Sequence, residues 1–463
     1  MAANERLASL MREAGFLAPD GSIGRKVLAR AVTREAHSRG IDRSYNHTYV
    51  KRWLDGVVPR DQRTRECVAA ALATRLGRGV TPEEIGFGRG ESVSADLGLR
   101  YEEEVSKGIE AVTRLWQVDL EEVRGIVDAG TNSAAWNEVS LNWLVGHRSP
   151  WRGSSASPTK VGSADIERLR STTDLFARMD NQYGGGHARR SLIEFLRNDV
   201  SSLLKGSYTM ESGRQLFSAA AESTLLAAWM SYDAGVHGLA QRYFIQALRL
   251  AEEGEDRWLA GSVLDAMSHQ ATFLGRFKEA ANLARAARMG TSGTATPTLT
   301  AHFHMMEARA FARLGDASAC DSAMSAAVTE FERRIPGEGP DFLDYFDDAE
   351  LAAEFGHCNR DLGRAVDAST YATQSLGEAN GEYLRSDFFA TMVLADAFLD
   401  QGEAERACEV ALRALDIGER LKSARCGVYV AEFRQRLDKL GDSPVVRDFK
   451  EQAAETSLWT PGQ

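Results

Sequence analysis

The C-terminal half of the chain repeats one local pattern five times. A glycine is followed by a small residue five positions later and by another twelve positions later, and successive glycines are 40, 40, 48 and 39 residues apart. A repeat of this length with small residues at fixed positions is typical of stacked helical hairpins. The sequence therefore predicts an all-α fold with a solenoid in this half of the chain. The glycines are Gly235, Gly275, Gly315, Gly363 and Gly402, the residues at the fifth position are Ala240, Ala280, Cys320, Ala368 and Ala407, and those at the twelfth are Ala247, Ala287, Ala327, Ser375 and Ala414.

The small residues have a physical reason, because the two helices of a hairpin cross closely. A larger side chain at a crossing point would push the helices apart and cost on the order of 1–3 kcal/mol. The spacing resembles that of tetratricopeptide repeats over roughly residues 215–440. The longest interval contains RRIPGEGPDFLDYFDD at residues 333–348, which predicts a long loop on one face of the solenoid.

Composition excludes several classes of protein. The chain has 463 residues, of which 43% are hydrophobic, and no apolar run approaches the roughly 20 residues that span a bilayer. The first residues lack the apolar core of a signal peptide, so we expect a cytoplasmic protein. The five cysteines are scattered without a C-x-x-C pair, which favours reduced thiols in the core over a zinc site. We expect no cofactor and no metal.

Charge is unevenly spread along the chain. Residues 1–90 contain 16 Lys and Arg residues against 10 Asp and Glu residues, whereas residues 91–463 contain 39 against 56. A basic segment joined to an acidic one indicates that only the first meets a polyanion such as DNA. A chance distribution of surface charge is the alternative interpretation.

Two amphipathic segments in the basic part predict helices. In residues 24–40 the apolar residues fall on one side at helical spacing. In residues 46–60, Asn46 is suited to cap the helix, while Val50 and Trp53 are spaced to face inward.

The outward face of this second helix predicts a contact surface for DNA. It carries hydrogen-bond donors and cations that reach base edges or phosphates, and Arg60, Arg63 and Arg65 are expected to follow in a loop beside the backbone. The alternative is a helical bundle that only mediates dimerisation. The residues predicted to bind DNA are Arg43, Asn46, His47, Thr48, Lys51, Arg52, Arg60 and Arg63.

Five positions carry a resemblance to a known family. Thr48, Val50, Trp53, Gly56 and Pro59 resemble the helix-turn-helix of lambda-repressor/Cro-like regulators. The stretch RLGRGVTPEEIGFG that follows resembles the end of this domain in a large actinobacterial family of transcriptional regulators that join it to tetratricopeptide-like repeats. The resemblance implies binding to double-stranded DNA, and relatives in that family are linked to development and secondary metabolism. The connection at residues 40–45 is several residues longer than the family's usual turn, which affects how the second helix docks.

The region between the two parts is less regular. Residues 91–165 predict a helical adaptor, with a Ser-, Gly- and Pro-rich flexible linker at residues 152–163. Trp143, Leu144 and Gly146 repeat the shape of the second predicted helix of the basic part, so a degenerate second DNA-binding unit is an alternative to an adaptor or dimerising region. The predicted domains are residues 1–90 (helix-turn-helix), 91–165 (adaptor and linker) and 166–455 (repeats).

The string YGGGHAR at residues 183–189 favours a sharp turn between two helices, because consecutive glycines do not continue a helix cheaply. The same string resembles one at this place in the actinobacterial family. A phosphate cradle is disfavoured, because no strand precedes it and no G-x-x-x-x-G-K-[ST] is present. Basic side chains at the start of the next helix, His187, Arg189 and Arg190, would face an anion in that second interpretation.

The concave side of a helical-repeat array usually accepts a peptide or a partner helix. Polar side chains near the first-helix positions are outward candidates for that role, and the alternative is that each is solvated or satisfied in the core. The candidates are Asn181, Tyr232, His269, Gln270, His304 and Asn359. No catalytic motif appears, and His302 and His304 point apart on a helix, so we expect no enzyme.

Together these patterns predict a DNA-binding transcriptional regulator. A homodimer is expected, because a single helix-turn-helix reads only a few base pairs. The repeats would dimerise or sense a peptide, a small ligand or a protein partner in their groove, without contact to a membrane. The alternative is a scaffold or anti-activator that acts through protein contacts and does not bind DNA.

Overall fold

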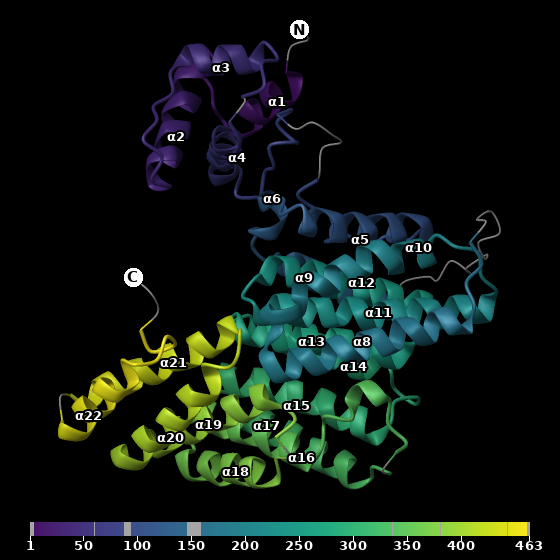
Figure 1. Ribbon diagram of the computed structural model, residues 1–463, viewed down its shortest axis with the longest axis vertical. Coiled ribbons are helices and arrows are strands. Elements are labelled where there is room, and N and C mark those ends of the chain that lie inside the picture. The colour runs from purple at the N-terminus through teal and green to yellow at the C-terminus, as the bar shows by residue number, and fades with distance from the viewer. Residues whose placement is uncertain are drawn as a thin grey trace. The chain divides into compact units, whose positions relative to one another are not determined.

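The computed structural model is all-α, with two compact units (Figure 1). Unit 1 comprises Met1–Leu97 and Val118–Gly130, and unit 2 comprises Gly98–Gln117 and Thr131–Gln463. The only β-type pairing in the described residues is two isolated bridges, so the predicted fold class is confirmed. The domain boundaries drawn from the sequence stay predictions. The structure describes residues 4–59, 61–87, 94–145, 159–335, 337–379, 381–441 and 443–460.

Unit 1 is a small bundle built around apolar side chains that point inward from each helix. Leu7, Leu28, Val50 and Leu72 are fully buried there, and Trp53 is 3% exposed. Its helices are α1 (Glu5–Glu13), α2 (Arg25–Ser38), α3 (His47–Leu54), α4 (Gln62–Leu76) and the short α6 (Arg124–Val127).

The long connection between α2 and α3 is ordered by one buried tyrosine. The Thr33 hydroxyl accepts a hydrogen bond from the Tyr45 backbone N–H at 2.9 Å, and the Tyr45 hydroxyl pairs with the Thr64 hydroxyl at 2.8 Å. This ties the connection to both α2 and α4. The connection is therefore anchored at Tyr45, while Asp42, Arg43 and Ser44 are exposed.

One prediction for this region is wrong. Arg63 and Arg65 do not lie in a loop after α3 but in the first turns of α4. The reason is Asp61, whose side chain accepts the Arg63 backbone N–H at 3.2 Å and so starts the helix early. Arg60, the remaining arginine of that set, lies outside the described residues.

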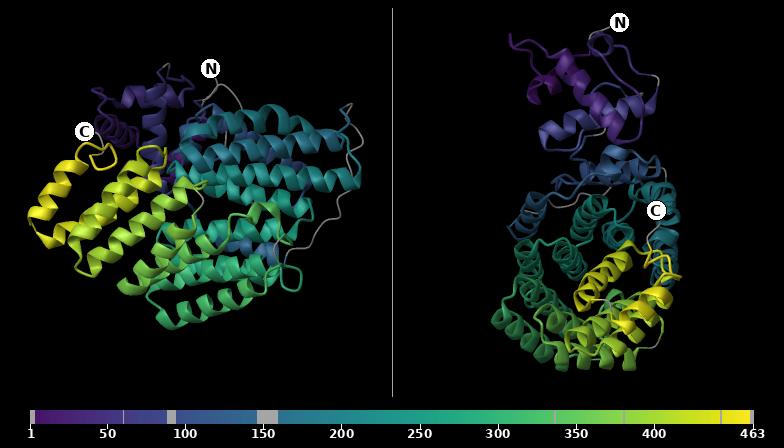
Figure 2. Two further views of the ribbon diagram at one scale, coloured as in Figure 1. Left: turned by 60° about the horizontal axis from the view of Figure 1, so that its bottom comes forward. Right: turned by 90° about the vertical axis from the view of Figure 1, so that its left-hand side faces the viewer.

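Unit 2 is a stack of antiparallel helix pairs, visible as successive layers from teal to yellow in Figure 2. Each of the five repeat glycines ends the first helix of a pair with φ between 72° and 80°, a conformation that glycine adopts without strain. The small residues predicted at the crossings are all buried, with Ser375 the most exposed at 6%. The predicted solenoid is confirmed.

The helices of unit 2 continue the chain order of unit 1. They are α5 (Val105–Leu120, its last residues in unit 1), α7 (Ser133–Val145), α8 (Ser163–Tyr183), α9 (Gly185–Phe195), η1 (Leu196–Val200), α10 (Ser201–Leu204), α11 (Met210–Asp233), α12 (His237–Glu253), α13 (Arg257–Phe273), α14 (Phe277–Gly290), α15 (Pro297–Leu314), α16 (Ala317–Glu332), η2 (Asp341–Leu343), α17 (Asp348–Asp361), α18 (Ala365–Glu378), α19 (Leu384–Asp400), α20 (Ala404–Gly418), α21 (Ala424–Leu437), η3 (Asp438–Leu440) and α22 (Pro444–Ala453). None of the described helices is long and apolar enough to cross a membrane.

Parts of the predicted adaptor pack directly on the repeats. The Trp143 ring of α7 covers Gly290 so closely that a Cβ at that glycine would collide with the ring. The α12 side chains Gln246 and Arg249 bond to backbone carbonyls of Gly98 and Glu102, at 3.0 and 2.6 Å. Trp143 is thus a packing residue of unit 2, whereas Gly146 and most of the predicted linker lie outside the described residues.

The repeat array closes on itself through contacts between residues about 190 to 240 positions apart in the chain. The Lys422 N–H donates to the Tyr183 carbonyl at 2.8 Å, and the Gly186 N–H donates to the Lys422 carbonyl at 3.0 Å. We call this contact of residues 183–186 with residues 422–425 the seam. In Figure 2 the yellow C-terminal helices lie beside the teal helices at the start of the array.

The three glycines of the seam are required by close approach of backbone atoms. A Cβ would lie 3.0 Å from Lys422 backbone atoms at Gly184, 2.7 Å from the Met230 carbonyl oxygen at Gly185, and 2.9 Å from the Lys422 carbonyl oxygen at Gly186. The predicted turn between two helices is confirmed, but it is confined to Gly184, because the other two glycines already belong to α9.

A buried ion network surrounds the seam. The Asp233 carboxylate accepts the Gly185 N–H at 2.9 Å and the Ser423 hydroxyl at 2.7 Å. The Asp180 carboxylate pairs with Arg385 at 2.8 Å, and burial raises the pKa of Asp180. Because buried charges are costly without partners, these pairs make the closed arrangement strongly dependent on each member.

We expect Ala327→Leu to destabilise unit 2, because Ala327 is fully buried where α15 and α16 cross. The larger side chain should cost about 1–3 kcal/mol, seen as a lower thermal midpoint by circular dichroism. Ser325→Leu, at an exposed position of α16, is the matched control and should leave the midpoint nearly unchanged. Equal midpoints for both variants would contradict the assignment of the crossing.

Gly186→Ala should loosen the seam specifically. Its Cβ would meet a backbone oxygen, so residues 422–425 must move, and amide exchange in peptides covering residues 183–187 and 420–425 should accelerate. Gly377→Ala in α18 places a Cβ in open space and serves as the control. Unchanged exchange at residue 422 in the Gly186 variant would show that the seam does not depend on this contact.

Candidate functional site

The outward face of α3 is the first candidate surface. Asn46 caps the helix, its side-chain oxygen accepting the Thr48 and Tyr49 N–H groups at 2.9 and 3.4 Å. Lys51 and Arg52 are exposed, and within the described part of the chain neither has an acidic partner within 4 Å. The opposite side of α3 is anchored by Trp53, whose ring packs on Phe87 at a centroid distance of 6.0 Å.

The structure brings together most of the residues predicted from the sequence on this surface. His47 and Thr48 are exposed in the first turn of α3, as the pattern predicts. Asn46 is exposed, but its oxygen is used by the cap, so only its amide hydrogens remain available. Arg63 is exposed on α4. Arg43 is exposed and forms an ion pair with Asp61 at 3.0 Å, which holds it against the start of α4.

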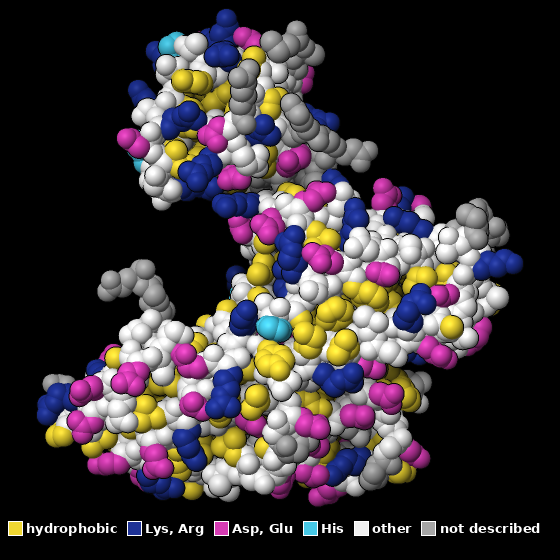
Figure 3. All heavy atoms as spheres, viewed as in Figure 1, with side chains coloured by type: hydrophobic (Ala, Val, Ile, Leu, Met, Phe, Trp, Pro, Cys, Tyr) yellow, Lys and Arg dark blue, Asp and Glu magenta, His cyan; other side chains and the backbone are white. Residues whose placement is uncertain are grey.

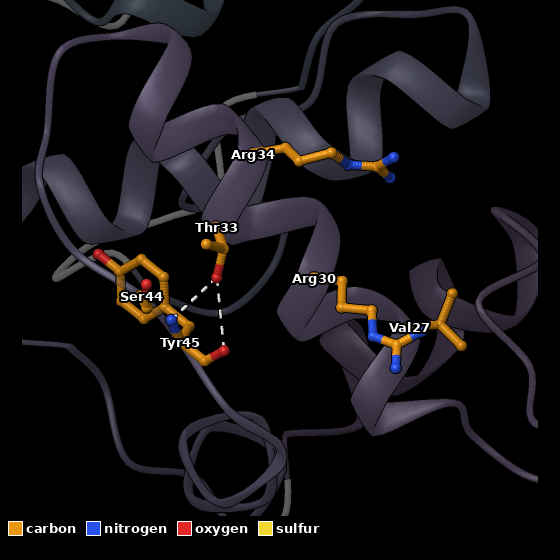
Figure 4. Close-up of a pocket in the computed structure, with 6 residues that line it drawn as sticks. All are labelled: Val27, Arg30, Thr33, Arg34, Ser44 and Tyr45. Atoms are coloured by element: carbon orange, nitrogen blue, oxygen red, sulfur yellow. Dashed lines mark hydrogen bonds between the residues drawn. The ribbon is translucent and has the colours of Figure 1, made fainter.

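Two arginines of α2 extend this surface and were missed by the sequence analysis. Arg30 and Arg34 are exposed and line a shallow hollow with Ser44 and Tyr45 (Figure 4). Their spacing of four residues places them on one face of α2. That spacing, opposite the apolar face of the same helix, is the signal that could have found them. On the face seen in Figure 3, Lys and Arg side chains are spread over unit 1.

The interior of unit 2 is the second candidate region, and here the prediction of outward side chains is wrong in part. Tyr232 and Gln270 are fully buried, and Asn359 is 3% exposed and donates to the Phe355 carbonyl of its own helix. The cause is the closed array, whose inner helices face one another across a narrow space. Asn181 and His304 are partly buried.

His269 is the one predicted groove residue that lines a described pocket. Its Nδ1 atom lies 3.1 Å from the Tyr232 hydroxyl, and burial lowers its pKa well below the usual value. The ring is therefore neutral at physiological pH. It contributes hydrogen bonding and shape to the pocket but no charge.

Paired charges fill the rest of the interior. Arg309 meets Glu354, and Arg360 meets Asp361 at 2.8 Å and Asp396 at 3.5 Å. Burial acts against the charged form of each arginine, but the neighbouring carboxylates outweigh it and raise the arginine pKa values. These residues hold fixed charges of both signs inside unit 2.

The loop expected at residues 333–348 is anchored near its C-terminal end by aromatic side chains, while Ile335, Glu338 and Asp341 are exposed. Phe346 is 3% exposed and stacks edge-on against His302 at 4.6 Å, and the Tyr345 hydroxyl lies 3.2 Å from the His302 Nε2 atom. The other ring nitrogen of His302 lies 2.6 Å from Asp265. Burial disfavours the charged ring, but Asp265 and two nearby glutamates outweigh burial and raise the pKa of His302.

Neither region has the composition of a metal centre. Within the described residues, no group of three His, Cys, Asp or Glu side chains is placed to hold an ion. The five cysteines are free and buried, which agrees with their predicted place in the core. The chemistry available is hydrogen bonding and charge pairing, on the surface of unit 1 and inside unit 2.

The stability of unit 2 should fall as the pH rises above about 6.5. Burial, followed by the charge of Glu354, raises the pKa of Glu350 from 4.5 to about 7. A raised carboxyl pKa stabilises the folded state below about 4.5, and this contribution is lost as the pH rises through about 7. The raised pKa of His302 also makes the stability fall as the pH rises above 6.5. The lowered pKa values of His269 and His357 change the stability mainly below pH 6.5, and in the opposite direction.

Thermal midpoints measured between about pH 6.5 and about pH 8.5 test this expectation. Glu252→Gln should flatten the decline, because burial raises the pKa of Glu252 from 4.5 to about 8, and Glu211→Gln at an exposed position should not. Glu350→Gln should change the slope only below about pH 7. A midpoint that rises with pH in the unmodified protein would contradict the sign.

Comparison with known proteins gives a family model for part of the chain and similarities to solved structures. Residues 7–88 match the family model described as the SP15 N-terminal domain, which corresponds to the bundle of unit 1. No curated protein matches the chain. Among solved structures, aspartyl phosphate phosphatase F from Bacillus subtilis is similar at 15% identity and a TM-score of 0.35, over 67% of this chain and 88% of that one. A similarity of that size carries no argument about function.

Proposed function

We propose that the protein is a DNA-binding transcriptional regulator in which unit 1 contacts double-stranded DNA through α3. The observation that supports this most directly is the exposed pair Lys51 and Arg52 on a helix whose opposite face is anchored by Trp53. A short helix held by its apolar face and presenting cations and donors is the arrangement that enters a major groove. The resemblance of Thr48, Val50, Trp53, Gly56 and Pro59 to helix-turn-helix regulators points in the same direction.

The side chains divide into two roles in this proposal. Lys51, Arg52, Arg30 and Arg34 are suited to phosphate contacts, which position the protein and are sensitive to salt. Thr48 and His47, in the first turn of α3, are suited to base edges. The acidic remainder of the chain would be repelled by DNA, which confines the contact to unit 1.

Two copies would act together. A single helix reads too few base pairs for useful affinity, and paired half-sites about one helical turn apart supply the rest. Unit 2 would dimerise or receive a peptide, a small ligand or a protein partner, and a ligand that prefers one conformation of the repeats would shift the population and the affinity for DNA. Control of development or secondary metabolism is the biological role that the family resemblance implies.

Replacing Lys51 and Arg52 together by alanine should strongly weaken specific DNA binding. We would map genome-wide binding of the tagged protein in its host and then measure binding to the recovered sites by fluorescence anisotropy at several salt concentrations. If the two side chains bind phosphates, the slope of log affinity against log salt should shrink by about 0.9 for each phosphate that the variant leaves unneutralised. If they read bases, sequence preference should change.

The matched control is Arg6→Ala with Arg12→Ala, which removes the same charge from exposed positions of α1. Loss of binding only in the α3 variant supports the proposal. If the unmodified protein gives no binding sites above the level of the α3 variant, DNA binding is excluded and the scaffold interpretation takes its place. Equal loss of DNA binding in both variants would show that α3 contributes only non-specific positive charge.

A further inference from the structure

A narrow pocket lies inside unit 2 between the inner helices of the array. It is lined from α13 by Thr272 and Phe273, from α15 by Arg309, from α17 by Asp361 and from α21 by Tyr429. The pocket therefore joins the middle of the array to the helix that follows the seam.

Three residues that line this pocket each carry a buried side-chain polar atom without a hydrogen-bond partner in the described structure. These atoms are the Thr272 hydroxyl, the Arg309 Nε and the Asp361 Oδ2. Other atoms of the two charged side chains are paired, because an Arg309 terminal nitrogen meets Glu354 and the Asp361 Oδ1 meets Arg360. The side chains of Arg309 and Asp361 are only 9% and 3% exposed. Buried polar groups left without partners are rare and costly, so a set of three around one pocket indicates a missing polar partner.

The size and charge of the pocket restrict what that partner is. Its volume is about 40 Å³, which accommodates about three waters or one small polar group at about 10–15 Å³ for each water. The lining carries charge of both signs, with Arg309, Arg313 and Arg360 beside Asp361 and Glu432, so a charged ligand group of either sign would meet like charge as well as opposite charge. The atoms without partners are two donors, the Thr272 hydroxyl and the Arg309 Nε–H, and one acceptor, the Asp361 Oδ2. They suit a neutral ligand group that has an acceptor and a donor on adjacent atoms.

We propose that this pocket binds a primary carboxamide. The carbonyl oxygen would accept from the Thr272 hydroxyl and the Arg309 Nε–H, and the amide N–H would donate to the Asp361 Oδ2. Phe273 and Tyr429 would cover the attached methylene groups. This inference deepens the sensing role proposed for unit 2, because it specifies the chemical class of the ligand.

The rest of the ligand would extend from the pocket to the protein surface beside α21. Val428 lines the pocket and is 41% exposed, and Arg313 beside it is partly exposed. A carboxamide is carried by the side chain of Asn or Gln in a peptide and by free small amides. Because α21 begins at the seam, a ligand held between α21 and α13 to α17 would stabilise the closed array.

The test uses the full chain and N-acetyl-glutamine N-methylamide as the probe, measured by saturation-transfer NMR and by the thermal midpoint. Propionamide tests the carboxamide group alone, and the glutamate and methionine analogues of the first probe match its size. The glutamine probe should bind at least about tenfold more tightly than the glutamate and methionine analogues, since the wrong group leaves buried atoms unpaired. If propionamide binds as well as the glutamine probe, the source is a free amide and not a peptide.

Thr272→Val removes one hydrogen-bond donor and keeps the shape of the side chain, so it should weaken binding of the glutamine probe about five- to tenfold. Thr272→Ser keeps the hydroxyl and should retain binding. The control is Thr391→Val, whose hydroxyl bonds within its own helix at 2.6 Å. Equal binding of all probes, or full binding by a folded Thr272→Val variant, would overturn the proposal and leave water as the occupant.

The DNA-binding proposal is tested separately from this one. The variant with Lys51 and Arg52 replaced by alanine should bind the glutamine probe as the unmodified protein does, because the pocket lies wholly in unit 2. Loss of probe binding in that variant would contradict a site confined to unit 2. Failure of DNA binding alone would leave the carboxamide site standing.

Discussion

The contact of two backbone segments at the seam is the constraint on which unit 2 depends. Three glycines let residues 184–186 approach Lys422 and Met230 at distances that no side chain permits. Asp233 then joins both sides, because it accepts from Gly185 in the first hairpin and from Ser423 before α21. Once the ends of the array are held, the inner helices must face one another, and their polar side chains are forced into a closed interior.

That closed interior explains why buried charges are so numerous there. In an open solenoid the concave face is wet, and residues such as Arg309 and Arg360 would be solvated. Here their side chains are 9% and 3% exposed, and each is matched to a carboxylate. Pairs of this kind add little net stability but become strongly destabilising when one partner is removed, so they favour one arrangement of the helices over its alternatives.

The sequence predicted the hairpins well, because their signal is local. The glycines at the turns and the small residues at the crossings satisfy constraints within about 12 positions of one another, and all are buried or turned as expected. The α3 cap and its inward and outward faces were predictable for the same reason. The seam was not predictable, because it joins Tyr183 to Lys422, and neither was the neighbouring pair of Asp180 with Arg385. A single sequence carries no periodic signal for contacts between such distant residues. The outward assignment of Tyr232 and Gln270 failed as a consequence. For YGGGHAR, the sequence predicted the turn from its glycines. It did not predict the Lys422 backbone, whose close approach requires those glycines.

Closure of the array also limits how a chain like this can change over generations. A linear array of repeats tolerates the gain or loss of a hairpin, because each repeat contacts only its neighbours. In unit 2, an added or deleted hairpin would displace Lys422 from the glycine turn and separate Arg385 from Asp180. A change in repeat number would therefore require the seam to be rebuilt, whereas the insert before α17 lengthens one repeat without changing the count.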